Sequence, residues 1–163
     1  MKNHQESRRT GRKVIKMDNS YDERIEELLE GPYWIADILP EQVPAETGGQ
    51  YPAVDRYFRQ PERLAAIHRR QAEILLRLNC YQEMVASFDG GESWERNPEP
   101  EGFAVRLSAL PSQADFRALF PGRKAMIGID PEDTWMTVWC PEPDFRQMIR
   151  QLALGEGFFF WQP

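Results

Sequence analysis

Three side chains are candidates for acid–base chemistry: Asp37, His68 and Asp130. His68 is the only histidine beyond residue 19, so a mechanism that needs an imidazole near neutral pH depends on it. Asp37 interrupts an apolar run, where an ionised group facing the core would be costly. If the fold gathered these three side chains around one cleft, the chain would be a small hydrolase or nuclease that uses carboxylates, a metal or His68.

Each of the three also has a structural explanation. The helical phase of His68 places it beside Leu64 and Leu75 on an apolar arc, which is typical of a buried histidine. Side chains alternate between the two faces of a strand, so Asp37 lies on one face while apolar neighbours lie on that face and on the other. The acid then indicates that water reaches its face of the sheet. Asp130 belongs to a turn, where acids are usually solvated. We therefore expect no catalytic residue in this chain.

Other chemical signatures are absent from the sequence. It contains no Ser-His-Asp order, no Walker loop, no dinucleotide fingerprint and no metalloprotease helix. Cys80 and Cys140 are its two cysteines, and without clustered histidines they make no zinc site. We predict reduced thiols, no bound metal and no cofactor.

Arginines repeat every seven residues along the strongest helical segment, at Arg63, Arg70 and Arg77. Such positions drift by only ~20° per step and line one edge of a helix. With Tyr51 and Tyr57 nearby, this stripe could bind phosphates or an acidic protein surface. The alternative is a solvated face with ordinary ion pairs, since an acid lies three residues after Arg70 and four before Arg77.

The stretch SFDGGESW, residues 87–94, places an acid and two glycines between two strand-like runs. A calcium loop needs more oxygen ligands, and a phosphate cradle needs a following helix. We expect a structural turn built on Ser87, Asp89, Gly91 and Trp94, in which glycine takes a positive φ.

This stretch resembles an Asp-box, the hairpin motif of sialidase-type propellers. The resemblance implies that the aspartate binds turn amides and that the aromatic residue packs beneath the hairpin, and it implies no catalytic role. One copy in 163 residues cannot build a propeller. The chain as a whole resembles small bacterial proteins of the clostridial kind, and that resemblance implies no activity.

Composition indicates one folded domain with a distinct N-terminus. The net charge of −6 combines +4 in residues 1–19 with −10 in residues 20–163. We predict a basic, flexible tail over 1–19 and a single domain over 20–163. No apolar stretch is long enough to span a membrane, so we expect a cytoplasmic protein without a membrane partner.

Periodicity and turn residues predict an α+β domain, with helices packed on a mainly antiparallel sheet of five to six strands. The expected helices cover 20–30, 61–79, 103–110, 113–120 and 143–154. The expected strands cover 33–39, 81–88, 93–97, 125–129, 134–140 and 158–161, and residues 40–52 form a long loop. A four-residue turn at 130–133 would place Gly128 opposite Trp135.

Because no chemical signature stands out, we expect a non-enzymatic interaction or regulatory module that binds another macromolecule. A protein partner is the first expectation, bound at the long loop and the arginine stripe. Nucleic acid could instead bind the basic tail or the stripe. A further variant is that the acidic domain mimics nucleic acid and inhibits a protein that binds it.

Overall fold

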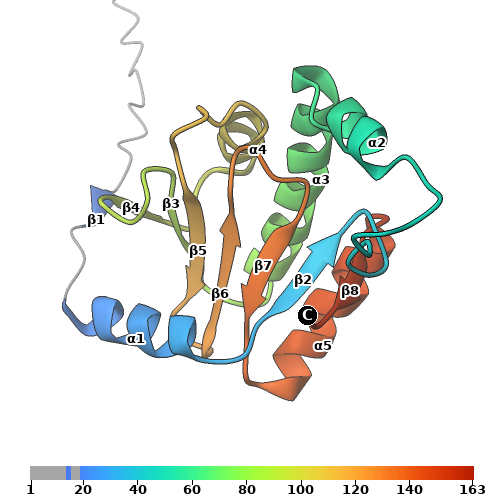
Figure 1. Ribbon diagram of the computed structural model, residues 1–163. Coiled ribbons are helices and arrows are strands. Elements are labelled where there is room, and N and C mark those ends of the chain that lie inside the picture. The colour runs from blue at the N-terminus through green and yellow to red at the C-terminus, as the bar shows by residue number, and fades with distance from the viewer. Residues whose placement is uncertain (1–13, 16–18) are drawn as a thin grey trace, which may run out of the picture.

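Residues 14–15 and 19–163 are described by a computed structural model, in which one antiparallel sheet carries helices on both faces (Figure 1). The predicted α+β class is confirmed. The helices are α1 (Asn19–Glu30), α2 (Tyr51–Phe58), α3 (Pro61–Asn79), α4 (Pro100–Ser108) and α5 (Pro143–Gly155). The strands are β1 (Val14–Ile15), β2 (Trp34–Asp37), β3 (Val85–Ser87), β4 (Trp94–Arg96), β5 (Phe116–Phe120), β6 (Ala125–Ile129), β7 (Met136–Trp139) and β8 (Phe159–Trp161).

The strand order across the sheet is β1-β4-β3-β5-β6-β7-β2-β8. Hairpins join β3 to β4, β5 to β6 and β6 to β7, whereas β2 and β8 add to the far edge from distant parts of the chain. Within the described residues the sheet thus has eight strands, more than the five to six expected, because β1 and β5 were not anticipated.

One face of the sheet is buried by α3, α4 and α5, which lie behind it in the view of Figure 1. The helices contribute Ile67, Ile74, Leu75, Leu78, Phe103, Leu107, Phe145 and Ile149 to this core, and the strands contribute Ala36, Ala86, Phe116, Ala118, Phe120, Ile127, Met136 and Val138. Burial of these apolar side chains is the main driving force for the fold.

The opposite face is covered only in part. Helix α1 lies in front of the lower ends of β5 and β6 in Figure 1 and packs Ile25 and Leu28 onto Trp94, Leu119 and Met126. This second, smaller core reaches Trp139 at the end of β7 and leaves the rest of β7, together with β2 and β8, without a helix on this side.

Proline sets the start of four helices. Pro52, Pro61, Pro100 and Pro143 lie in the first turns of α2, α3, α4 and α5, where a missing N–H costs nothing. At α4 the Glu99 carboxylate also accepts hydrogen bonds from the N–H groups of residues 101 and 102, at 2.8 and 2.7 Å.

The prediction of a helix over 113–120 is wrong, because residues 116–120 form β5 between β3 and β6. Phe116, Leu119 and Phe120 have helical spacing, yet Phe116 and Phe120 face the helical core while Leu119 faces α1. A strand buried on both faces lacks simple alternation, so the surrounding sheet decides its structure.

The predicted register of the β6–β7 hairpin is also wrong. Gly128 pairs with Thr137 instead of Trp135, because the connection spans residues 130–135. The glycine nevertheless makes room for an indole, since a Cβ atom on Gly128 would lie 3.1 Å from Cζ3 of Trp139.

The described part of the expected tail belongs partly to the sheet. Val14 and Ile15 pair with Glu95 and Trp94 of β4. Residues 1–13 and 16–18, which carry the basic charges, lie outside the described residues.

The turn over residues 87–94 is held by its own polar groups. Asp89 Oδ1 accepts hydrogen bonds from Ser87 Oγ at 2.8 Å and from Ser93 N at 2.9 Å. The indole Nε1 of Trp94 donates to the Gly91 carbonyl at 3.0 Å, and the ring is buried under α1. Gly90 and Gly91 have φ angles of 74° and 99°. Within this loop the aspartate therefore binds the turn itself.

Replacing Gly91 by alanine should lower the free energy of unfolding by about 1–2 kcal/mol, because an L residue resists the positive φ. Urea unfolding followed by tryptophan fluorescence measures the change. Gly48→Ala is the matched control, since a Cβ atom there meets nothing within 4 Å. Equal effects of the two substitutions would contradict this account of the turn.

Candidate binding site on the open face of the sheet

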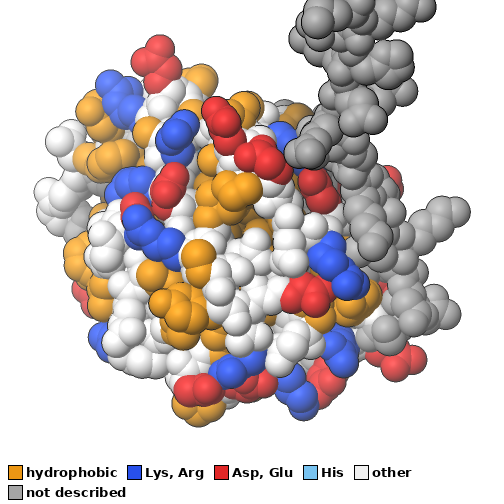
Figure 2. Space-filling model, turned by 180° about the vertical axis from the view of Figure 1, so that it is seen from behind, with side chains coloured by type: hydrophobic (Ala, Val, Ile, Leu, Met, Phe, Trp, Pro, Cys, Tyr) orange, Lys and Arg blue, Asp and Glu red, His pale blue; other side chains and the backbone are white. Residues whose placement is uncertain are grey.

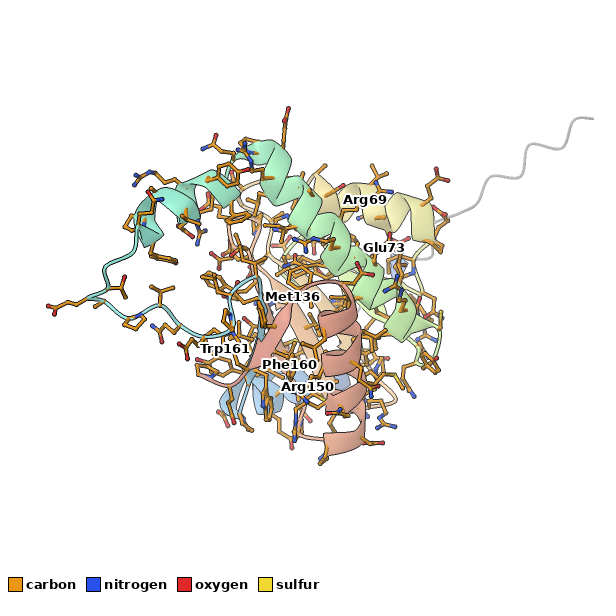
Figure 3. All side chains as sticks on the ribbon, turned by 90° about the vertical axis from the view of Figure 1, so that its right-hand side faces the viewer. Arg69, Glu73, Met136, Arg150, Phe160 and Trp161 are labelled. Carbon is orange, nitrogen blue, oxygen red and sulfur yellow. The ribbon has the colours of Figure 1, made fainter. Side chains whose placement is uncertain are left out.

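The uncovered part of the sheet is rich in aromatic side chains. We define the open face as Ile35, Asp37, Trp135, Thr137, Trp139 and Trp161, from β2, β8, β7 and the residue before β7. Along β7, residues 136 and 138 are buried in the helical core while residues 137 and 139 are half-exposed. Figure 3 likewise shows Trp161 on the side of the sheet away from α5 and Phe160 on the side of α5. Strand alternation thus gives β7 one dry and one half-exposed face, whereas Ile35 and Asp37 of β2 are both only 8% exposed.

Three adjoining hollows lie along the open face. The largest, of about 540 Å³, is lined by Tyr33, Ile35, Asp37, Leu39, Glu41, Gln42, Val43, Tyr51, Trp135, Thr137, Trp161 and Pro163. A second, of about 230 Å³, continues from Asp37 and Trp135 beneath α2, and a third, of about 150 Å³, continues from Trp135 and Thr137 towards Asp130. Together they form a groove bordered by α1 and by the loop that precedes α2.

Asp37 lies at the junction of two of these hollows and is only 8% exposed. Its Oδ1 accepts a hydrogen bond from Ile38 N at 2.7 Å. Burial raises the pKa of Asp37, and hydrogen bonds from the N–H groups of Ile38 and Leu39 and from the Thr134 side chain oppose this only in part. The fold therefore holds a carboxylate whose charged form is disfavoured.

Arg59 connects α2 to the β6–β7 loop beside this carboxylate. Its Nε lies 2.8 Å from Asp55 Oδ2 and its Nη1 lies 3.2 Å from Asp133 Oδ1. The guanidinium also lies over the Trp135 ring, 5.7 Å from the centroid. Because two carboxylates already neutralise Arg59, the Coulomb attraction between its guanidinium and Asp37 acts from a greater distance and only partly stabilises the charged form of Asp37.

Two side chains of helix α3 also bind the β6–β7 loop. Nε2 of His68 lies 3.1 Å from the Asp133 carbonyl oxygen, which can only accept, so Nε2 carries the proton. Burial lowers the pKa of His68, whose side chain is 3% exposed, and favours the neutral ring. Gln71 donates from Nε2 to the Thr134 carbonyl at 3.4 Å. Both side chains position the loop that carries Trp135.

The three acid–base candidates are not brought to one cleft. The two hollows that Asp37 lines include neither of the others, and the hollow that Asp130 lines includes neither Asp37 nor His68. His68 is occupied by a backbone carbonyl. This placement gives no support to a hydrolase that uses the three together.

The arginine stripe is engaged in contacts within the domain. The guanidinium of Arg63 lies 3.7 Å from the centroid of the Tyr57 ring. Nη1 of Arg70 donates to the Glu156 carbonyl at 3.1 Å, and Arg77 forms an ion pair with the Glu156 carboxylate. Arg70 and Arg77 thereby join α3 to the end of α5. Of the five predicted binding residues, Tyr51 alone lines the groove on the open face.

A separate hollow of about 440 Å³ lies between α1 and the β5–β6 turn. Four of its charged side chains are paired with one another: Nε of Arg123 lies 2.6 Å from Glu142 Oε2, and Nζ of Lys124 lies 3.8 Å from Glu27 Oε1. Arg24 donates from Nη1 to the Pro121 carbonyl at 2.9 Å. In the part of the chain that the structure describes, no group of three His, Cys, Asp or Glu side chains is arranged to hold a metal ion.

Sequence reasoning missed most of the open face. Tyr33 and Trp161 come from segments far apart in the sequence, and Trp135 was assigned to a wrong register. The available signal was the period of two at residues 33, 35 and 37 and again at 135, 137 and 139. That signal marks one face of each strand, but does not reveal that no helix covers it.

Comparisons of the chain with protein-family models, with curated proteins and with solved structures find no match. Among residues 14–15 and 19–163, no helix has the length and apolar character needed to cross a membrane.

Replacing Asp37 by asparagine should increase the free energy of unfolding at pH 7 by about 1 kcal/mol, because it removes a buried charge and keeps a side-chain acceptor. The native state holds the Asp37 proton more tightly than the unfolded chain, so the penalty is present above the raised pKa and fades as the pH falls towards 3.8. The gain from the substitution should shrink over the same range.

Urea unfolding at a series of pH values measures this difference. Glu92→Gln, which removes an equal charge from an exposed position in the 87–94 turn, should change stability by less than about 0.5 kcal/mol. A loss of stability in Asp37→Asn at pH 7 would show that the carboxylate stabilises the fold.

Proposed function

We propose that this protein is a non-enzymatic interaction module that binds another protein through the open face. The observation that carries the proposal is the part of a sheet face that α1 leaves uncovered, where four aromatic side chains line the 540 Å³ hollow. Tyrosine and tryptophan are enriched at protein interfaces because they combine a large apolar area with a polar group.

Exposed apolar side chains continue around the groove. Tyr33 is 42% exposed, and Tyr51 and Phe159 are exposed to a similar degree. A contiguous apolar patch with a polar border is the usual sign of a binding surface on a monomeric protein. The indole Nε1 of Trp161 donates to the Leu39 carbonyl at 3.2 Å, so one wall of the groove is already ordered before a partner arrives.

The other proposals for this chain have less support. Binding of phosphates by the stripe would require Arg70 and Arg77 to leave the contacts that join α3 to α5. Mimicry of nucleic acid requires a continuous acidic face, and Figure 2 shows acidic and basic side chains interspersed over the helical side of the domain. Neither alternative accounts for an uncovered aromatic face.

A photo-crosslinking amino acid at Tyr33 or Thr137 should give discrete cross-linked products with one protein in the native host, since both positions border the groove. The same amino acid at Tyr81 or Val105, which are exposed and line none of the three hollows on this face, should not. Immunoblots and mass spectrometry of the products identify the partner.

Thr137→Lys should abolish the product formed from Tyr33, because a charged side chain would stand in the centre of the groove. Gln151→Lys, on the exposed side of α5, should leave it unchanged. Products of equal yield from all four positions would overturn the proposal. A cross-linked dimer of this chain that Thr137→Lys abolishes would replace the separate partner by a second copy.

A further inference from the structure

The hollows that meet at Asp37 combine a negative charge with aromatic walls. Leu39, Val43, Tyr51 and Trp135 line both the 540 Å³ and the 230 Å³ hollow, and Trp161 adds a further wall to the larger one. The only side chain common to both hollows that bears a full charge is Asp37. A ligand that entered here would meet the Asp37 carboxylate between aromatic rings, with Glu41 lining the larger hollow and Asp55 the smaller one.

The charge of Asp37 is unmatched within the described residues. Its hydrogen bonds come from neutral donors, the N–H groups of Ile38 and Leu39 and the Thr134 side chain, and no described cation lies within 4.0 Å of it. The nearest guanidinium, that of Arg59, is held by Asp55 and Asp133. A buried carboxylate without a cation is unfavourable on its own and favourable once a cation arrives.

The aromatic walls favour the same kind of ligand. The face of an aromatic ring attracts cations, most strongly when water is excluded. The domain already uses this interaction beside the hollow, where Arg59 lies over Trp135. A planar guanidinium can stack flat on a ring and at the same time donate two parallel N–H groups to a carboxylate, a geometry that the compact ammonium group does not offer.

We propose that the hollow at Asp37 binds the guanidinium of an arginine side chain from a basic segment of the partner protein. This inference rests on the proposed function and specifies the chemistry of the partner. Residues 20–163 carry a charge of −10, so the domain as a whole also attracts a basic segment. Aromatic stacking and the Asp37 carboxylate would distinguish arginine from neutral side chains of the same shape.

The test uses the full chain and Nα-acetylarginine amide as the probe. Two-dimensional NMR follows the indole N–H signals of Trp135 and Trp161, which single Trp→Phe variants assign. We expect both signals to shift with a dissociation constant on the order of 1 mM, as befits a ligand of this size. Nα-acetylcitrulline amide, a neutral analogue of nearly the same shape, should leave them unshifted.

Asp37→Asn should weaken binding of the arginine probe at least tenfold, and Glu92→Gln should leave it unchanged. The native pattern of indole signals in Asp37→Asn shows that this variant has folded. Equal shifts by the arginine and citrulline probes, or undiminished binding to Asp37→Asn, would overturn the inference.

The arginine titration requires no partner, so it is independent of the cross-linking experiment. Cross-linking at Tyr33 together with failure of the arginine probe would overturn the guanidinium site and leave the proposed function standing. Arginine binding that depends on Asp37, together with absent cross-links, would support the cation site and remove the protein partner.

Discussion

The loop between β6 and β7 is the point on which the candidate site depends, because four side chains from three other elements are bonded to it. From α3, His68 and Gln71 bind two of its carbonyl groups; from the end of α2, Arg59 binds Asp133; and from β2, Asp37 accepts from Thr134. The loop is held mainly by hydrogen bonds and ion pairs, although it lies between a packed core and an accessible face. They fix Trp135, the residue that all three hollows share.

Much of the fold follows from local patterns. Helices α3 and α5 begin at proline and keep one apolar arc, and the strands at β2, β6, β7 and β8 were expected close to their observed bounds. Strand β5 was not, because Phe116, Leu119 and Phe120 fit a helix as well as a strand buried on both sides. The predicted register of the β6–β7 hairpin was wrong because the connection extends to residue 135. The hydrogen bonds that hold this longer connection come from α3, which local patterns around the hairpin do not reveal.

The candidate site was harder to predict than the fold. The arginines of α3 form a regular pattern, but Glu156 lies far away in sequence and takes up two of them. Asp37 was recognised as unusual because it interrupts an apolar strand, and the expectation of an accessible face at that position was close. What sequence patterns do not contain is the extent of α1, which ends before it can cover β7 and β2.

Strand β8 completes one wall of the groove, and this has a consequence for biosynthesis. Trp161 binds Leu39 across 122 positions of the chain, and β8 pairs with β2 alone among the described strands. A ribosome delivers β2 early and β8 after every other described element. During translation the outer edge of β2 therefore stays open and the groove lacks Trp161, so the proposed binding site is incomplete until β8 has joined the sheet.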